Sequence, residues 1–390
     1  MMQLSKKTIN KLTSAARDPK PVSGLTHCFY RYPARFSPQF AAAAIECFSK
    51  PGDLVMDPFM GGGTTVIEAL IRGRKVVGND LNSLATFIAR VKTTPLTSWE
   101  TRAICHWANA VVPTLSYRRP RKQIEHTFEK RKMRNLNLVR ARFVSKIVAG
   151  ALVTIEKLPT GPARDFARCA VLRASQWALD GRKRQTHAWE FRARLIEDVH
   201  SMLSGLCELM RAMPRNHTEW PEFVLTNLDA SAISDAAVFG CNRHRVRLVV
   251  TSPPYPGVHM LYHRWQVDGR RETPAPYWIA GTNDGQASSF YNFGDRSDPL
   301  CQDYFAASLK TLKAIRSVME RDGIIVQMLA FNRPDAQLPV YLRNMDAAGF
   351  REVQQAQSRI WRHVPNRKWH ACTKGRINSA TEVVLIHRTR

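Results

Sequence analysis

The chain has 390 residues, of which 44% are hydrophobic and 9% aromatic, and it carries 58 basic against 32 acidic side chains, a net charge of +26. This length is enough for a full α/β core with one further substructure, and the apolar content indicates a folded protein and not a disordered one. The charge excess favours a polyanionic partner, and no apolar run approaches the roughly 18 residues of a membrane span.

The positive charge is concentrated in one stretch, because residues 118–194 contain 20 basic and 6 acidic side chains. We expect this stretch to contact nucleic acid; a solvated helical surface is the alternative. Its densest cationic clusters are Arg118, Arg119, Arg121, Lys122, Arg131, Lys132, Arg182, Lys183 and Arg184.

The 8 cysteines are far apart in sequence and form no CxxC pair. This spacing argues against metal knuckles and against a disulfide framework, and it fits reduced thiols in a cytoplasm. Residues 1–20 are polar and basic and lack the apolar centre of a signal peptide. We therefore expect a soluble intracellular protein.

The elements predicted for the first part of the chain alternate between helix and strand. Helices are expected over residues 6–17, 41–48 and 64–72, and strands over 53–57 and 75–78, with a glycine loop at 61–63. A helix between two such strands forms a βαβ unit, and we therefore predict a parallel sheet.

From about residue 95 to residue 220 no convincing strand pattern is present. Leu136, Val139, Phe143 and Ile147 recur at helical spacing, and residues 187–213 also have a helical pattern, which predicts a long basic helical insert. Further strands are expected over 222–226, 246–250, 323–329, 350–356 and 382–387, helices over 302–320 and 338–348, and a loop rich in proline, glycine and aromatic residues up to residue 299.

A glycine loop follows the first predicted strand, with Asp57 before Pro58-Phe59-Met60-Gly61-Gly62-Gly63-Thr64-Thr65. Glycines let backbone N–H groups approach a ligand, and a helix that begins at Thr64 offers its positive end to an anion. Asp80 ends the next strand, where a carboxylate can accept hydrogen bonds from ribose hydroxyls. An ordinary turn is the alternative. A dinucleotide fingerprint needs glycine in place of Val66, and a P-loop needs a lysine after the glycines, so both fit poorly.

The sequence Ser252-Pro253-Pro254-Tyr255 follows the apolar run 248–250. Two prolines directly after a buried strand end the sheet ladder and fix the backbone, which can hold acceptors in one position; a plain strand stop is the alternative. The glycine loop resembles the DPFxGxGTT cofactor motif of DNA amino-methyltransferases, and the tetrapeptide resembles the (D/N/S)PPY motif of the same enzymes. The resemblance covers residues 30–95 and 225–390.

This resemblance implies a Rossmann-like α/β sheet that binds S-adenosylmethionine and carries the long helical insert. Residues 36–38 match an upstream motif that cradles the methionine part, Asp80 would hold the ribose, and Asp229 would contact the adenine. A turn before the next helix and a helix N-cap at Asp229 are the alternatives. The implied cofactor-contacting residues are Phe36, Ser37, Pro38, Asp57, Pro58, Phe59, Gly61, Gly63, Thr64, Asp80 and Asp229.

The same resemblance implies that Ser252, Pro253, Pro254 and Tyr255 catalyse methylation of an exocyclic amino group in DNA. The lone pair of that group is delocalised into the ring, and acceptors at the Ser252 side chain and the Pro253 carbonyl can favour a pyramidal nitrogen. Tyr255 could stack on a base flipped out of the duplex. Serine at the first position is typical of the branch that methylates the 4-amino group of cytosine. Methylation of adenine, methylation of RNA and a catalytically inactive DNA-binding relative are the alternatives.

We predict three segments: a cofactor-binding half at 21–95, a basic helical insert at 96–220 and a catalytic half at 221–390. The insert is a candidate for target recognition, but it precedes Asp229 rather than Ser252, which departs from the family. The loop 256–299 is therefore a second candidate, or else an aromatic lid. Its cationic and aromatic residues include Arg264, Trp265, Arg270, Arg271, Tyr277 and Trp278.

His259 and His263 are four residues apart, but no acidic third ligand accompanies them and the implied reaction needs no metal, so we expect no metal site. The expected partner is double-stranded DNA, with a cognate restriction endonuclease as a further candidate. The expected location is the nucleoid in the cytoplasm of a prokaryotic cell.

Overall fold

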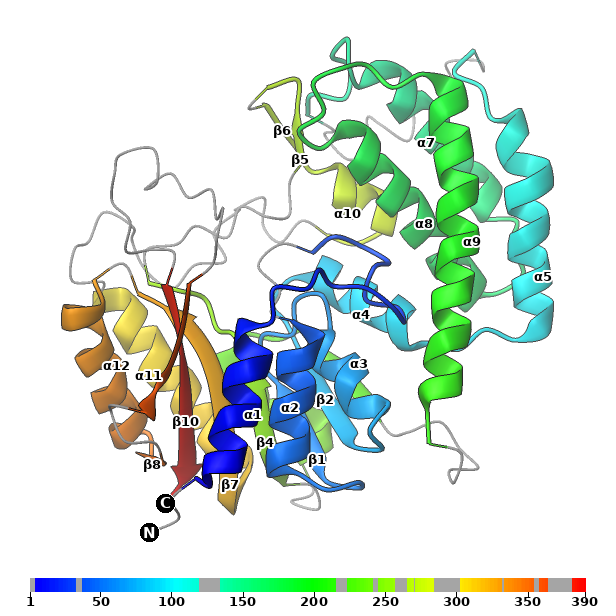
Figure 1. The fold of residues 1–390 in the computed structure, drawn as a ribbon. Coiled ribbons are helices and arrows are strands. Elements are labelled where there is room, and N and C mark those ends of the chain that lie inside the picture. The colour runs from blue at the N-terminus through cyan, green and yellow to red at the C-terminus, as the bar shows by residue number, and fades with distance from the viewer. Residues whose placement is uncertain are drawn as a thin grey trace.

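The protein is described here by a computed structural model that covers residues 4–32, 37–118, 134–214, 223–240, 245–256, 265–269, 271–283, 302–331, 333–353, 358–363 and 381–390. These residues form a sheet with helices on both faces and a helical region that stands above one edge of the sheet (Figure 1). No helix within the described ranges is long and apolar enough to cross a membrane.

The central sheet has the strand order β3-β2-β1-β4-β7-β10-β8, and β9 pairs with β10. All neighbours from β3 to β7 are parallel, whereas β10 is antiparallel to β7, β8 and β9. The predicted α/β fold with a largely parallel sheet is therefore confirmed. The strands are β1 (Leu54–Asp57), β2 (Lys75–Asn79), β3 (Phe223–Thr226), β4 (Val246–Thr251), β7 (Met319–Ala330), β8 (Phe350–Glu352), β9 (Ile360–His363) and β10 (Thr381–Thr389).

Two apolar clusters lie on the two faces of this sheet. Side chains alternate between the faces along a strand, so Val55 packs in one cluster and its neighbour Met56 in the other. The first cluster is covered by α1 (Lys6–Arg17), α2 (Pro38–Phe48) and α3 (Thr64–Leu70). The second is covered by α11 (Gln302–Val318), α12 (Pro334–Ala347) and the short 3₁₀ turns η3 (Ala230–Asp235) and η4 (Ala237–Phe239).

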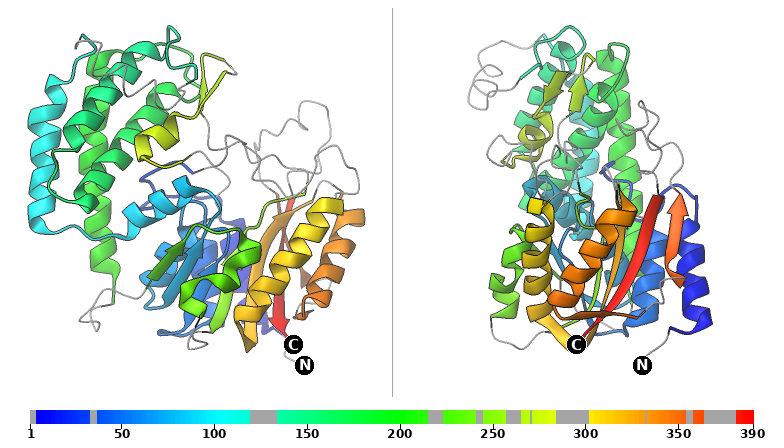
Figure 2. Two further views of the ribbon diagram at one scale, coloured as in Figure 1. Left: turned by 180° about the vertical axis from the view of Figure 1, so that it is seen from behind. Right: turned by 90° about the vertical axis from the view of Figure 1, so that its left-hand side faces the viewer.

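The helical region is built from two separate parts of the chain. One part contains α4 (Ser83–Thr93), α5 (Ser98–His106), the short helical turns η1 (Trp107–Val111) and η2 (Val112–Thr114), α7 (Arg142–Ile155), α8 (Gly161–Leu179) and α9 (Ala188–Ala212). The other contains β5 (Trp265–Val267), β6 (Arg271–Thr273) and α10 (Ala275–Ala280). Both contribute to one apolar cluster, and Figure 2 shows them together beside the sheet from two further directions.

Several predicted elements are corrected by the structure. Residues 134–141 form turns and not a helix, because Asn135 adopts a left-handed φ of 65° and its Nδ2 donates to the Glu272 carbonyl at 2.7 Å. Val139, one of the apolar residues at helical spacing, is 60% exposed. The loop expected between Tyr255 and residue 299 contains β5, β6 and α10. The predicted strand over 350–356 ends at Glu352.

Candidate active site

Asp57 joins the glycine loop to the tetrapeptide region. Its Oδ1 accepts hydrogen bonds from the backbone N of Phe59 at 3.1 Å and from Thr251 Oγ1 at 2.7 Å. Asp57 ends β1 and Thr251 ends the neighbouring parallel strand β4, so their side chains meet at the carboxyl edge of the sheet. Burial raises the pKa of Asp57 to about 6, although the hydrogen bonds that it accepts lower it. Two motifs that lie 194 residues apart are thus in direct contact.

A second hydrogen bond strengthens this junction. Thr65 stands in the first turn of α3, and its Oγ1 donates to the backbone carbonyl of Val250 at 3.2 Å. Both side chains of the junction, Thr65 and Thr251, are fully buried. A buried hydroxyl needs a partner, and both hydroxyls find one across the boundary between the two motifs.

The glycine loop is held by hydrogen bonds from within the protein. Gly61 and Gly63 have positive φ angles of 47° and 76°, and the backbone N of Gly63 donates to the Met60 carbonyl at 2.7 Å. A Cβ on Gly62 would lie 2.9 Å from Cβ of Tyr32, and one on Gly61 would lie 3.0 Å from Cε1 of the same ring. The glycines are therefore needed for this turn and for the close packing of Tyr32.

Asp80 fixes the loop from the end of β2. Its Oδ2 accepts from the backbone N of Gly61 at 2.8 Å and its Oδ1 accepts from the backbone N of Asn82 at 2.9 Å. Burial raises the pKa of Asp80 to about 6, and these two backbone hydrogen bonds lower it. Each oxygen of an ionised carboxylate has two lone-pair sites, so each keeps acceptor capacity for a ligand hydroxyl.

Two further residues at the loop were missed by the sequence reasoning. Tyr32 packs on the glycines and its hydroxyl accepts from Asn82 Nδ2 at 3.3 Å; burial raises the pKa of this phenol. Lys92 on α4 is 1% exposed, and its Nζ donates to the Gly62 carbonyl at 2.7 Å. The aromatic run before residue 33 was a visible signal for Tyr32, whereas a lone lysine in a helix gave none for Lys92.

Asn79 connects the loops that follow three strands. Its Nδ2 donates to the carbonyls of Pro58 and Leu228, and its Oδ1 accepts from Thr226 Oγ1 at 2.7 Å. Asp229 is the residue after Leu228 and is exposed. Its Oδ1 accepts a hydrogen bond from the backbone N of Ser231 at 2.8 Å. The N-cap expected as the alternative is present, at the same edge of the sheet as Asp80.

The upstream motif lies at the start of α2. Ser37 caps that helix, because its Oγ accepts from the backbone N of Phe40 at 3.1 Å, and Pro38 occupies the first turn, where no N–H is needed. Since α2 leads back into β1, its start is at the carboxyl edge of the sheet (Figure 1). Phe36 lies outside the described residues.

The predicted tetrapeptide begins at the end of β4 and is held by three hydroxyl groups. Ser252 Oγ donates to the backbone carbonyl of Met328 at 3.0 Å and lies 3.2 Å from the Tyr255 hydroxyl. The Tyr304 hydroxyl donates to the Pro254 carbonyl at 3.1 Å. The Tyr255 hydroxyl donates to Glu382 Oε1 at 2.9 Å. Residues from β7, α11 and β10 therefore fix the tetrapeptide.

The described cationic candidates lie in the helical region. The guanidinium of Arg182 stacks on the Trp177 ring at 4.0 Å, and Arg184 forms an ion pair with Glu190 at 2.5 Å. Lys183 and Arg271 are exposed. The backbone N of Gly181 donates to the Gln266 carbonyl at 2.9 Å, which brings the 182–184 turn next to β5 and its partner strand β6.

The remaining candidates are less informative. Arg118 lies over the Tyr117 ring at 5.9 Å and is exposed. Arg119, Arg121, Lys122, Arg131, Lys132, Arg264 and Arg270 lie outside the described residues, as do His259 and His263. No group of three or more histidine, cysteine or acidic side chains arranged to hold a metal is found in the described part of the chain.

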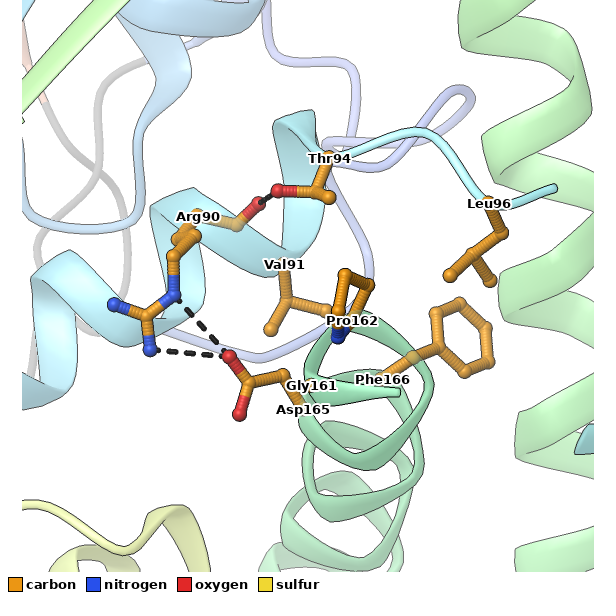
Figure 3. Close-up of a pocket in the computed structure, with 8 residues that line it drawn as sticks. All are labelled: Arg90, Val91, Thr94, Leu96, Gly161, Pro162, Asp165 and Phe166. Atoms are coloured by element: carbon orange, nitrogen blue, oxygen red, sulfur yellow. Dashed lines mark hydrogen bonds and ion pairs between the residues drawn. The ribbon is translucent and has the colours of Figure 1, made fainter. Parts of the chain in front are cut away.

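A cavity of about 260 Å³ lies between the end of α4 and the start of α8 (Figure 3). Its lining is mainly apolar, and its two charged residues, Arg90 and Asp165, pair with each other at 3.1 Å. None of the motif residues lines it. Trp265, Tyr277 and Trp278, which were candidates for contact with a displaced base, are instead buried within the helical region.

The strand order, with one antiparallel strand beside β7, gives the Rossmann-like sheet that was expected, and the glycine loop, Asp80 and the Ser-Pro-Pro-Tyr sequence lie at the ends of its strands. Residues 5–89 match the family model described as DNA methylase. This match confirms, for these residues, the resemblance to DNA amino-methyltransferases that the sequence motifs indicated.

Two curated relatives match short parts of this chain. Type II methyltransferase M.MvaI of Kocuria varians is 43% identical over 75 residues, which are 18% of this chain and 16% of that protein. Type II methyltransferase M.MjaII of Methanocaldococcus jannaschii is 33% identical over 66 residues, 17% of this chain and 12% of that protein. The chain thus spans less than a fifth of the length of these relatives.

Among solved structures, TrmN from Thermus thermophilus aligns with 91% of this chain and 49% of that chain, at 11% identity and a TM-score of 0.36. That likeness is weak, and the fold assignment rests on the strand order.

S-adenosylmethionine is the cofactor that this resemblance implies, and the described residues fit it. Asp80 offers two acceptor oxygens at the end of β2, beside a glycine turn that is fixed by the hydrogen bond Asp80 accepts from Gly61. The same turn is joined through Asp57 to Thr251, the residue before the tetrapeptide. A ribose held at Asp80 and a methionine part on the turn would therefore lie along the edge that leads to Ser252.

Proposed function

We propose that this protein transfers a methyl group from S-adenosylmethionine to an exocyclic amino group in DNA, with the 4-amino group of cytosine as acceptor. The observation that carries the proposal is the hydrogen bond between Asp57 and Thr251, at 2.7 Å. It joins the start of the cofactor loop to the residue before the tetrapeptide, at the ends of two adjacent strands. A methyl donor and an acceptor base bound at these two motifs would be neighbours, and positioning is a large part of catalysis for such a reaction.

The cofactor supplies an activated methyl group, and the protein supplies position and hydrogen-bond acceptors. Ser252 Oγ gives its proton to Met328, so that toward the substrate it can act as an acceptor for an amino hydrogen. The Pro253 carbonyl is a second acceptor on a backbone that two prolines restrict. Tyr255 offers its ring to the flipped base.

The helical region would bind the DNA backbone. Lys183 is exposed in the 182–184 turn and Arg271 is exposed at the start of β6, and phosphate contacts of such cations position a duplex without reading its sequence. We propose double-stranded DNA as substrate, a restriction-modification system with a cognate endonuclease as setting, and the nucleoid of a prokaryotic cell as location. The insert at 96–220 and the segment 256–299 are the candidates for target recognition.

The choice of cytosine rests on Ser252, because enzymes of the family that methylate adenine more often carry Asp or Asn at this position. The adenine 6-amino group is the second candidate. The remaining alternatives are methylation of an amino group in RNA and a DNA-binding protein without activity. Against inactivity, the glycine loop, Asp80 and all four residues of the tetrapeptide are present.

Incubation with labelled S-adenosylmethionine and unmethylated genomic DNA, followed by mass spectrometry of the nucleosides, tests the proposal. Methyl groups on the 4-amino nitrogen of cytosine support the proposal. Methyl groups on adenine would show that the proposed reaction is right but that the target base is adenine. Transfer to RNA in place of DNA would change the substrate class. No transfer to either nucleic acid by a folded, cofactor-binding protein would overturn the proposed activity.

A further inference from the structure

The hydroxyl of Tyr255 is bound within the protein. It donates to Oε1 of Glu382 on β10 at 2.9 Å, and Glu382 is 2% exposed. The other carboxylate oxygen accepts from Nε of Arg362 on β9 at 2.6 Å, and Nη1 of Arg362 donates to the Ala16 carbonyl of α1 at 3.0 Å. A partly buried chain of hydrogen bonds therefore runs from the predicted catalytic ring to the first helix of the protein.

Glu382 is an unusual residue for its place in the sheet. It is followed on β10 by the apolar run from Val383 to Ile386, and it is paired in register with Ala330 on β7. Burial of a carboxylate is costly even when it is paired, and an apolar pair often stabilises a fold equally well. Stability alone therefore gives little reason for a carboxylate here, whereas its contact with Tyr255 gives one.

The carboxylate also determines which way the hydroxyl protons point. Tyr255 has one hydroxyl proton, and a charged acceptor such as Glu382 binds it more strongly than a neutral hydroxyl does. Ser252 then receives no proton from Tyr255, and its own proton goes to the Met328 carbonyl at 3.0 Å. Toward a substrate, Ser252 Oγ is left with lone pairs alone, which is what a hydrogen-bond acceptor for an amino group requires.

We propose that Glu382 is a positioning residue of the reaction, which orients the Tyr255 ring and keeps Ser252 an acceptor. The inference rests on the proposed function, because it needs an amino group at Ser252. Glu382 acts through its hydrogen bond to the phenol and has no contact of its own with the reacting atoms. It joins β10, on the far side of β7, to a site that the sequence motifs place on β1, β2 and β4.

The variant Glu382→Gln tests the proton direction with little change in shape. Its amide oxygen takes the hydrogen bond from Arg362, and its amide nitrogen then donates to the Tyr255 oxygen, whose proton turns toward Ser252. We expect kcat for methyl transfer to fall by about ten- to a hundredfold, the effect of one hydrogen bond to a charged group. Because the glycine loop is not touched, the KM for S-adenosylmethionine should not change.

A background without the phenol isolates this pathway. Tyr255→Phe keeps the ring but has no hydroxyl to orient, so Glu382→Gln should cause no further loss of kcat in that background. A loss of the same size in both backgrounds would mean that Glu382 acts independently of Tyr255 and would overturn the proposal.

Glu352→Gln is a matched control for a general effect on the sheet. Glu352 lies on β8 beside β10 and binds Arg359 through two hydrogen bonds of 2.7 Å each, without contact to the tetrapeptide. Its variant should lower stability and leave kcat unchanged. Equal loss of kcat in both variants, or wild-type kcat in Glu382→Gln, contradicts the proposal.

A readout without turnover separates this inference from the proposed function. In full-length protein labelled with ¹³C at Cζ of tyrosine, the resonance of Tyr255 is assigned by its absence in Tyr255→Phe. Glu382→Gln should shift this resonance, because the phenol changes from donor to a carboxylate into acceptor from an amide. An unshifted resonance overturns the contact. If the wild-type protein transfers no methyl group while the resonance shifts, the proposed function fails and the contact stands.

Discussion

The edge of the sheet and the helical region both carry charged residues, but they hold them in opposite ways. At the edge of the sheet, Asp57 and Glu382 are 1% and 2% exposed and accept short hydrogen bonds from Thr251 of β4 and Arg362 of β9. In the helical region, Lys183 and Arg271 are exposed. Buried hydrogen bonds fix geometry, whereas exposed charges attract a polyanion and are screened by salt. Substitutions at the edge of the sheet should therefore have large effects on ligand affinity and activity that do not depend on salt. Substitutions of the exposed cations should have small effects on DNA affinity that disappear at high salt.

The largest effect is expected for Asp80→Ala. This variant removes both acceptors that hold the backbone of Gly61 and Asn82, and with them the acceptors proposed for the ribose. Because hydrogen bonds to a charged group contribute about 1.5–3 kcal/mol each, the affinity for S-adenosylmethionine should fall at least about a hundredfold. Titration calorimetry at two salt concentrations measures this loss. A loss that disappears at high salt would contradict the assignment of Asp80 to the buried, geometric part of the site.

The structure also predicts a stability effect of Asp57→Asn that depends on pH. The pKa of Asp57 is raised to about 6 by burial, so the folded protein binds more protons than the unfolded chain between about pH 4 and pH 6. The wild-type protein therefore gains stability from this group as the pH falls through 6 toward 4, and lacks it above 6. Asparagine keeps the acceptor for Thr251 and Phe59 without a charge.

We expect Asp57→Asn to raise the free energy of unfolding at pH 7.5 by up to about 3 kcal/mol, because the pKa of Asp57 in the folded protein is roughly two above its ordinary value. The gain should shrink as the pH approaches 4. Urea unfolding of both proteins across this range is the measurement. Thr251→Val serves as a control, because it removes the partner hydroxyl and leaves the buried carboxylate. A gain that is the same at pH 7.5 and pH 4.5 would show that the Asp57 carboxylate is not the cause.

Tyr255→Ala tests the proposed stacking of a flipped base. Loss of stacking between a base and an aromatic ring costs about 1–3 kcal/mol, so kcat/KM for DNA should fall by about ten- to a hundredfold. Tyr255→Phe keeps the ring and should retain more activity than Tyr255→Ala. Steady-state kinetics with both variants decide the matter: if the phenylalanine variant is as impaired as the alanine variant, the hydroxyl and not the ring face is what the reaction uses.

The comparison of the two regions also explains what the sequence could predict. Residues 6–17 are predicted and observed as a helix with the same bounds, and β1, β2 and β4 lie within one or two residues of their predicted positions. These elements can be predicted from the local periodicity of apolar residues and from the proline and glycine residues that end helices and strands. Asp57, Asp80 and the tetrapeptide stood out because their motifs are contiguous in sequence.

The residues that were missed act over long sequence separations. Glu382 contacts Tyr255 across 127 positions, and Lys92 reaches Gly62 across 30. Neither has a local pattern, because a buried charged side chain is recognisable only by the partner that the fold brings to it. The segment with β5, β6 and α10 was predicted as a loop for a related reason: its elements are short, and their burial is provided by α8, which lies far away in sequence.

The smallest effect, a change in the salt dependence of DNA binding, is expected in the helical region. It should differ between two neighbouring cations, Lys183 and Arg184. Lys183 is exposed, whereas the charge of Arg184 is engaged by Glu190 at 2.5 Å. If Lys183 binds a phosphate, Lys183→Ala should reduce the slope of log K against log salt by roughly 0.9, the value for one phosphate contact on duplex DNA. Arg184→Ala should change the slope less, because it also frees Glu190 to repel the duplex, which lowers affinity without removing a phosphate contact. Binding of a fluorescent duplex between 50 and 300 mM salt measures both slopes. If the two variants change the slope equally, the ion pair opens on binding and Arg184 contacts DNA as Lys183 does; if neither changes it, the 182–184 turn is not part of the DNA surface.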